Sequence, residues 1–216
     1  MFALRQHRPR MMMFCNPNNP TGKHTYLGEL KTWVEQHQDT LFVFDEAYTQ
    51  FAIGKHSMLS LYRNFQNVLL VRSMTKDYAL AGLRLGYLIG ESSLIQVIAN
   101  LRPAWNVNGF AQAGGITVLD QWEWFRDSLH QLINSDMVTL MYNLSQSGLE
   151  VMPSDVHYFL VRVGNATEFR AKLLEHKIMV RDCTSFGLPE YVRIATRTPE
   201  DNAKLIAAIE QVQHDR

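Results

Sequence analysis

The chain has 216 residues, of which 46% are hydrophobic and 19% charged, so it is apolar enough to bury a core rather than stay disordered. Lysine plus arginine and aspartate plus glutamate number 21 each, and this balance argues against nucleic acid and charged membrane surfaces as partners. No apolar stretch is long enough to cross a membrane, no secretory leader is recognisable, and two cysteines exclude a disulfide framework, so we expect a cytoplasmic protein.

The first half of the chain alternates short apolar runs with an amphipathic one. Each apolar run ends in polar residues or glycine, which is typical of buried strands. Apolar residues recur at helical spacing over residues 26–37, which predicts a helix. The strands are expected at residues 11–15, 41–44, 68–71 and 85–89. This alternation predicts an α/β fold with a mainly parallel sheet, and we expect its core to include the methionines at 11–13.

The second half predicts a small α+β domain. Apolar residues alternate at three and four over residues 122–144, which predicts one long helix, and Gly148 is a suitable stop because helices favour glycine just past their end. Further strands are expected at residues 158–163 and 191–195, and further helices at 168–174 and 199–212. We therefore predict two domains, a large domain over residues 1–107 and an interdomain helix plus small domain over 108–216.

Three of the predicted strands run into polar segments suited to a ligand site. These segments begin at Asn16, Asp45 and Ser73, the third continuing through Lys76 to a glycine- and arginine-containing turn. In open α/β sheets, ligands bind beyond the carboxyl ends of the strands. Each segment alone has an ordinary explanation as a turn, a cap or a solvated loop, but their ordered occurrence predicts one site.

The ordered motifs resemble those of the class I/II aminotransferases, members of the fold-type-I superfamily of pyridoxal-phosphate enzymes. The matching blocks are CNPNNPTG at 15–22, FDEAY at 44–48, SMTKDYALAGLRLGY at 73–87 and YVRIATR at 191–197. Together they cover essentially the whole chain. The resemblance implies part of a three-layer cofactor-binding domain followed by a small α+β domain, with pyridoxal 5′-phosphate as cofactor and a small amino compound as substrate.

The resemblance also assigns roles to residues of the predicted large domain. Lys76 would bind the cofactor aldehyde covalently and move protons at the substrate α-carbon, which suits an amine whose pKa falls on desolvation. Asp45 would pair with the pyridine nitrogen and keep it protonated, so that the ring accepts electrons. Tyr48 would hydrogen-bond the ring oxygen, and Ser73 and Arg84 would contact the phosphate.

Two further residues complete the site that the resemblance implies. Asn19 would hydrogen-bond the ring oxygen together with Tyr48. Arg193 would bind the substrate carboxylate through two parallel hydrogen bonds. A site that draws on both domains can close over its substrate. Family members are homodimers, so a homodimer is expected as well.

Two branches of the family fit, and the shared motifs do not separate them. One is typified by histidinol-phosphate aminotransferase and the other by L-threonine-O-3-phosphate decarboxylase, and both handle phosphorylated amino compounds. Arg197, four residues after Arg193, is the residue that discriminates between the branches. The aminotransferase branch usually has glycine at this position, whereas the decarboxylase has the pattern R-x-x-x-R-S, with arginine there. Arg197 would receive a carboxylate or phosphate, or would be a solvated strand-end side chain. We expect transamination first, with decarboxylation as the alternative.

Other chemistry-bearing residues receive structural interpretations. We expect His157 to fill a strand end rather than touch substrate, and Cys15 and Cys183 to pack rather than react. No metal site is predicted, because the histidines and cysteines show no ligand spacing. In the family, the sequence before CNPNNPTG supplies strands and a phosphate-binding helix N-terminus, whereas fourteen residues precede Cys15 here. We therefore expect unpaired sheet edges and uncovered apolar faces, with an inactive fragment as a third possibility.

Overall fold

The computed structural model describes residues 2–55 and 57–214, which form two compact units. The first unit contains the chain up to Asn18 together with His24–Arg126. The second contains Asn19–Lys23 together with the chain from Asp127 onward. Among the described residues, no helix combines the length and the apolar character needed to cross a membrane. Each unit is described by itself below.

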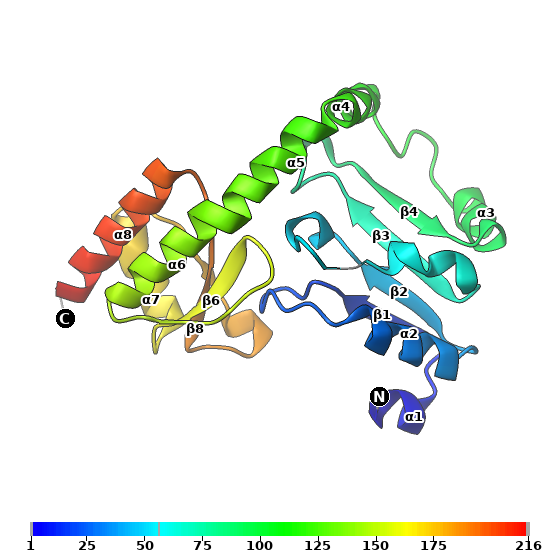
Figure 1. Ribbon diagram of the computed structural model, residues 1–216, viewed down its shortest axis with the longest axis horizontal. Coiled ribbons are helices and arrows are strands. Elements are labelled where there is room, and N and C mark those ends of the chain that lie inside the picture. Colours follow the sequence, from blue (N-terminus) through cyan, green and yellow to red (C-terminus); the bar gives the residue numbers. More distant parts are fainter. Residues whose placement is uncertain (1, 56, 215–216) are drawn as a thin grey trace. The chain divides into compact units, whose positions relative to one another are not determined.

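The first unit is built on a four-stranded sheet with the order β1-β2-β3-β4 (Figure 1). The strands are β1 (Met11–Cys15), β2 (Leu41–Asp45), β3 (Val68–Ser73) and β4 (Gly86–Gly90). β1 and β2 run parallel, as do β2 and β3, whereas β4 pairs antiparallel with β3. The predicted mainly parallel sheet and its four strands are confirmed. Residues 74–85, which include Lys76, connect β3 to its antiparallel neighbour β4.

Gly86 permits the close approach between β4 and β3. Ser73 lies opposite Gly86 in the register, and a Cβ added at Gly86 would lie 2.7 Å from the Arg72 carbonyl oxygen. A side chain there would force the strands apart at the point where β3 ends. Gly86 therefore allows Ser73, at the end of β3, to stay paired with β4.

Helices and short turns complete the first unit. The α-helices are α1 (Phe2–His7), α2 (Leu27–Gln36), α3 (Ser92–Asn100), α4 (Gly109–Asp120) and the start of α5 (Trp122–Gln131), with 3₁₀ helices at Thr49–Phe51, Met58–Ser60, Tyr62–Asn64 and Ala81–Leu83. The predicted helix over 26–37 is confirmed as α2. Its Leu30, Trp33 and Val34 are buried in one apolar cluster with Phe42 and Phe44 of β2, so α2 covers one face of the sheet.

The other face of β1 is exposed, which corrects the prediction for its methionines. Met11 and Met13 are 54% and 67% exposed, while Met12 and Phe14 pack against the apolar cluster. Successive side chains of a strand point to opposite faces, so an unbroken apolar run does not tell whether both faces are covered. Placing residues 11–13 in the core was therefore wrong for two of the three. The exposure agrees with the uncovered apolar faces expected from the sequence.

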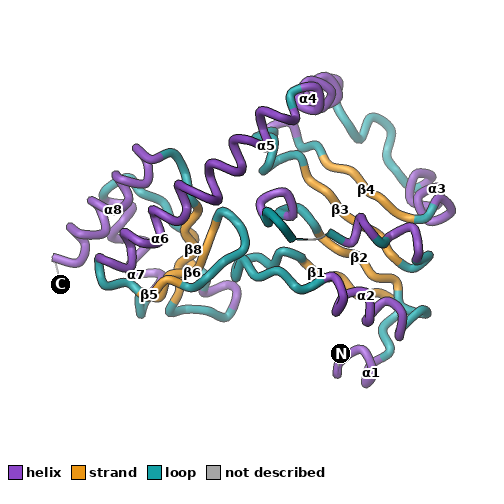
Figure 2. The backbone as a smooth tube through the Cα atoms, viewed as in Figure 1, coloured by secondary structure: helices purple, strands orange, loops and turns teal. Residues whose placement is uncertain are grey.

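The second unit is a small α+β structure built on an antiparallel sheet (Figure 2). Its strands are β5 (Glu150–Val151), β6 (Tyr158–Arg162), β7 (Arg181–Asp182) and β8 (Tyr191–Ala195), in the order β5-β6-β8-β7. Its helices are α6 (Met137–Gln146), α7 (Ala166–Glu175) and α8 (Pro199–His214), with a 3₁₀ helix at Thr184–Phe186. α7 packs against α8 and against β7 and β8, and the predicted small α+β domain is thereby confirmed.

The predicted long helix contains a local change of winding. α5 leads into a π-helical turn at Leu132–Asp136 and then into α6, so the helix is continuous but not uniformly α-helical. Gly148 has a φ of 78°, as its predicted role at the helix end requires. The compact units divide within α5, because α4 packs with the first unit. The assignment of residues 108–216 to a separate functional domain stays a prediction.

Candidate functional site

Asp45 and Ser73 end two neighbouring parallel strands, so their side chains stand at one edge of the first unit's sheet. Asp45 is the last residue of β2, and its Oδ1 accepts a hydrogen bond from the Ala47 N–H at 3.0 Å. Ser73 is the last residue of β3, and its Oγ lies 2.7 Å from the Thr75 Oγ1. This is the carboxyl edge at which open α/β sheets bind ligands.

Lys76 and Tyr48 follow these strand ends. The Lys76 side chain is exposed, and it has no hydrogen-bond or ion-pair partner within residues 2–55 and 57–214. Tyr48 lies in the turn after β2, with its ring centroid 6.3 Å from that of Phe51. An exposed primary amine three residues beyond Ser73 is accessible to an aldehyde, as covalent cofactor attachment requires.

Arg84 lies in the turn between β3 and β4. Its backbone is left-handed, with a φ of 59°, and its Nη1 donates to the Ala81 carbonyl oxygen at 2.9 Å. The rest of its guanidinium is exposed and keeps donors for an anion. The first unit therefore holds Asp45, Tyr48, Ser73, Lys76 and Arg84 among the predicted site residues.

Arg193 is the centre of a second cluster, within the second unit. It lies on β8, its Nη1 donates to the Asn19 Oδ1, and its guanidinium carbon lies 4.8 Å from the centroid of the Tyr158 ring. Its Nε is buried and has no hydrogen-bond partner among the described residues. Buried donors are normally paired, so this Nε is suited to an acceptor such as a carboxylate oxygen.

Asn19 belongs to the second unit although it follows β1 directly in the chain. The segment Asn19–Lys23 packs with this unit, where the Asp155 N–H donates to the Gly22 carbonyl oxygen at 3.0 Å. Sequence reasoning assigned Asn19 to the cofactor ring, and it missed the hydrogen bond that the Asn19 side chain accepts from Arg193. The role toward the ring stays a prediction.

Arg197, the residue that separates the two branches, already has a partner. Its side chain is 72% exposed, and its Nε donates to the Asp201 Oδ2 at 2.8 Å across one turn at the start of α8. This pairing corresponds to the solvated strand-end alternative. The remaining guanidinium donors stay available to an anion.

The residues with structural interpretations behave mostly as packing groups. Cys183 is fully buried, and burial raises the pKa of its thiol. The Cys15 Sγ donates to the Pro17 carbonyl oxygen at 3.1 Å. The His157 ring lies edge-on to the Tyr158 ring at the start of β6, with centroids 5.2 Å apart. The buried thiol of Cys183 confirms its predicted packing role.

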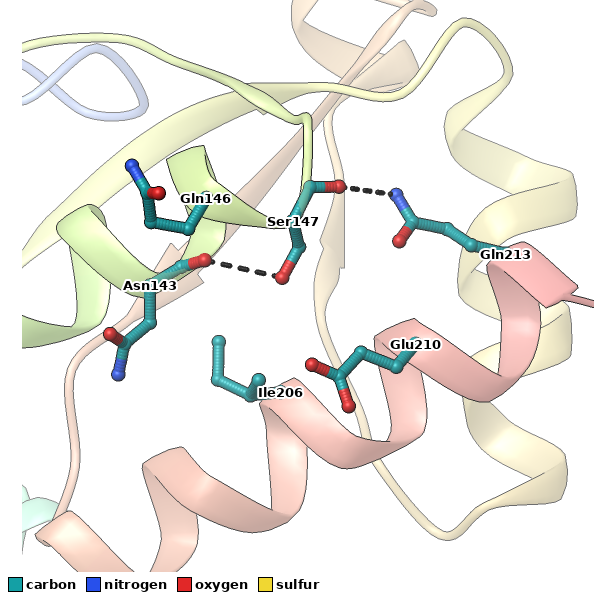
Figure 3. Close-up of a pocket in the computed structure, with 6 residues that line it drawn as sticks. All are labelled: Asn143, Gln146, Ser147, Ile206, Glu210 and Gln213. Carbon is teal, nitrogen blue, oxygen red and sulfur yellow. Dashed lines mark hydrogen bonds between the residues drawn. The ribbon is translucent and has the colours of Figure 1, made fainter.

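A groove of the second unit lies between α6 and α8 and contains none of the predicted site residues (Figure 3). Ser147 donates through its Oγ to the Asn143 carbonyl oxygen and accepts through its own carbonyl from the Gln213 side chain. The groove is lined by Asn143, Gln146, Ser147, Ile206, Glu210 and Gln213. Its side chains include neither a lysine nor an arginine, so it is not the predicted site.

Comparison with known proteins identifies the class to which this fold and these residues belong. The pattern of the family described as Aminotransferase class I and II matches residues 3–209. The fold is part of that of the fold-type-I pyridoxal-phosphate enzymes, a sheet domain followed by a small antiparallel-sheet domain. The chain belongs to the class I and II aminotransferase family.

Among curated relatives, the chain is similar to histidinol-phosphate aminotransferases. It is 34% identical over 208 residues to histidinol-phosphate aminotransferase 2 of Ralstonia nicotianae, covering 93% of this chain and 55% of the relative. It is 32% identical over 211 residues to histidinol-phosphate aminotransferase 2 of Carboxydothermus hydrogenoformans, covering 95% and 58%. The chain thus spans a little more than half the length of these relatives.

Among solved structures, both branches are represented. L-threonine-O-3-phosphate decarboxylase from Porphyromonas gingivalis matches with a TM-score of 0.87 and 29% identity, covering 96% of this chain and 66% of that one. Histidinol-phosphate aminotransferase from Clostridium acetobutylicum matches with a TM-score of 0.92 and 23% identity, covering 100% and 67%. The second likeness concerns the fold alone.

Proposed function

We propose that the chain is part of a pyridoxal-phosphate-dependent aminotransferase that acts on a small phosphorylated amino compound, as a histidinol-phosphate aminotransferase does. The observation that carries this proposal is the edge of the first unit's sheet. Asp45 and Ser73 end adjacent parallel strands there, and the exposed amine of Lys76 follows. The relatives at 32–34% identity support the substrate class.

The donor set of the first unit suits this cofactor. A carboxylate, a hydroxyl, a guanidinium and an unpartnered amine match a ring nitrogen, a phosphate and an aldehyde. Asp45 would hold the ring nitrogen, Tyr48 would bind the ring oxygen, and Ser73 and Arg84 would hold the phosphate. When bound, pyridoxal phosphate supplies an electron sink for charge that develops at the substrate α-carbon. Lys76 Nζ would hold the aldehyde and move the proton at that carbon.

The second unit would bind the substrate carboxylate. Arg193 has a buried Nε without a partner among the described residues, and Asn19 and Tyr158 fix the rest of its guanidinium. A guanidinium oriented in this way binds a carboxylate with geometric specificity as well as charge. By analogy with the family, we also propose that the whole enzyme is a homodimer.

Decarboxylation of a phosphorylated amino acid is the second candidate. The observation that favours it is Arg197, an exposed arginine at the offset where the decarboxylase branch has one, together with the decarboxylase of Porphyromonas gingivalis among the structural relatives. An additional cation would suit a substrate that carries both a carboxylate and a phosphate.

Covalent trapping tests the cofactor proposal. The chain is incubated with pyridoxal phosphate, reduced with borohydride and digested, and the modified peptide is identified by mass. We expect the label on Lys76 and its loss in Lys76→Ala. Lys31→Ala is the control, because Lys31 pairs with Glu35 on the surface of α2. A label that persists at another lysine in Lys76→Ala would refute the assignment.

A substrate panel separates the remaining candidates. Histidinol phosphate with 2-oxoglutarate reports transamination, and threonine phosphate with carbon dioxide detection reports decarboxylation. Amino transfer from histidinol phosphate supports the first candidate, and release of carbon dioxide supports the second. A chain that takes up no cofactor and acts on neither substrate would be the inactive fragment.

A further inference from the structure

A buried ion pair lies beside the proposed cofactor residues of the first unit. Arg72 Nε and Glu46 Oε2 are 2.8 Å apart, and the two side chains are only 7% and 1% exposed. Taking two charges out of water is costly, and apolar residues of similar volume often stabilise a fold at least as well. Stability alone is therefore a weak reason for this pair.

A serine and a backbone amide add further hydrogen bonds to the pair. Ser57 Oγ donates to Glu46 Oε2 at 2.7 Å and accepts from Arg72 Nη2 at 2.9 Å. The Met58 N–H donates to Glu46 Oε1 at 2.9 Å, and Met58 itself lies in the apolar cluster. Glu46, Arg72 and Ser57 thus form a closed ring of side chains, which we call the Glu46–Arg72–Ser57 ring. It fixes the geometry of both charged side chains.

The strand register places this ring directly behind the proposed cofactor residues. Asp45 lies opposite Val71 in the parallel pairing of β2 and β3, and the Glu46 N–H donates to the Val71 carbonyl oxygen at 2.9 Å. The next residues along, Glu46 and Arg72, are therefore opposite each other. Because side chains alternate between faces, this pair lies on the reverse side from Asp45 and Ser73.

We infer that Glu46 and Arg72 are positioning residues, which hold the ends of β2 and β3 so that Asp45 and Ser73 keep the geometry needed to bind the cofactor. The inference rests on the proposed function. Glu46 adjoins Asp45 and Arg72 adjoins Ser73, so the ion pair links the two strand ends one residue away from each site residue. Directional hydrogen bonds closed into a ring restrict the arrangement of these strand ends more than an apolar contact does.

Two variants separate positioning from stability. Glu46→Gln keeps the shape and an acceptor but removes the charge, and the double variant Glu46→Leu/Arg72→Met removes both charges and leaves none unpaired. Glu190→Gln is the matched control, because Glu190 pairs with Arg162 on the surface of the second unit. The variants are compared by the dissociation constant for pyridoxal phosphate, by the rate of trapping at Lys76 and by amide hydrogen exchange at the strand ends.

We expect both variants to bind pyridoxal phosphate at least tenfold more weakly than the unaltered chain, with trapping still confined to Lys76. We also expect faster exchange in segments 44–48 and 72–76 than in the remaining strands. The double variant separates positioning from stability, because we expect it to show weaker binding and faster exchange even when its unfolding midpoint equals that of the unaltered chain. Glu190→Gln should match the unaltered chain in every measurement.

Binding within twofold of the unaltered chain, in a double variant of equal stability, would overturn the inference while leaving the proposed function intact. If the unaltered chain takes up no pyridoxal phosphate, the proposed function fails and hydrogen exchange decides alone. Faster exchange confined to the two strand ends then supports positioning, and unchanged exchange there overturns it. If Glu46→Gln does not fold, the double variant supplies the same comparison.

Discussion

Replacing Asp77 with asparagine should stabilise the first unit at neutral pH. Asp77 follows Lys76 and is only 8% exposed, and its Oδ1 accepts from the Tyr78 N–H at 3.1 Å. Burial raises its pKa from 3.8 to about 6, because water no longer solvates the charged form, although the Tyr78 amide and the Arg72 charge act in the opposite direction. Asparagine keeps the acceptor for Tyr78 and carries no charge.

The sign and size follow from this difference in pKa. The folded chain holds the proton more tightly than the unfolded chain, so the free energy of unfolding falls as pH rises from 3.8 to about 6 and then levels off. A difference of about two in pKa corresponds to ~3 kcal/mol. The Asp77→Asn variant has no carboxyl group to ionise at this position, so its free energy of unfolding does not fall in this way as pH rises. Its advantage over the unaltered chain should therefore be small near pH 4 and approach ~3 kcal/mol at pH 7.

Urea unfolding followed by circular dichroism between pH 4 and 7.5, without cofactor, measures this difference. Asp201→Asn is a control of opposite sign, because the hydrogen bond from Arg197 lowers the pKa of Asp201. That control should be less stable than the unaltered chain by an amount that hardly changes between pH 5 and 7.5, because Asp201 loses its charge only near or below pH 3.8 in either state. An Asp77→Asn advantage that is constant with pH, or a variant less stable at pH 7, would refute the reasoning about burial.

Three further substitutions test the second unit by urea unfolding. Gly22→Ala should lower the free energy of unfolding by roughly 2–4 kcal/mol, because Gly22 has a φ of 68° and a Cβ there would lie 1.9 Å from Ser154 Oγ. A loss below ~1 kcal/mol would show that the segment rearranges freely. Thr196→Val should raise the free energy of unfolding by about 1 kcal/mol, since the buried Thr196 hydroxyl has no partner among the described residues. A clear loss of stability would instead reveal a hydrogen bond from this hydroxyl to water. Arg197→Ala should change stability by less than ~1 kcal/mol, because its pair with Asp201 is exposed; a larger loss would mean that the pair is structural.

The strands were predictable where chemistry changes sharply along the chain. β2 begins and ends where the apolar run from Leu41 meets Thr40 and Asp45. α4 was not predicted, because it is apolar on both sides: Val118 is buried, while Phe110 and Ile116 are more than half exposed. A helix without a polar face gives no periodic signal. The coverage of each sheet face depends on neighbours that a local pattern does not contain.

The residues in and beside the candidate site also divide into those that the sequence predicted and those that it did not. Asp45, Ser73 and Lys76 were predictable because each follows an apolar run in a recognisable motif. Glu46 and Arg72 were missed, since a charged residue next to a strand normally faces solvent. Their partnership depends on the register that sets β2 against β3. Opposite charges one residue past Asp45 and one before Ser73 were the signal that would have found them.

The assignment of Asn19–Lys23 to the second unit changes how the protein can be divided. The chain passes between its two units three times, after Asn18, after Lys23 and after Arg126. A cut within α5 would therefore leave Asn19–Lys23 on the N-terminal piece, and the larger part of the second unit would keep this segment only through non-covalent contacts. A recombinant fragment beginning at residue 127 would lack this five-residue segment, leaving Arg193 without its acceptor on Asn19 and Asp155 without the Gly22 carbonyl.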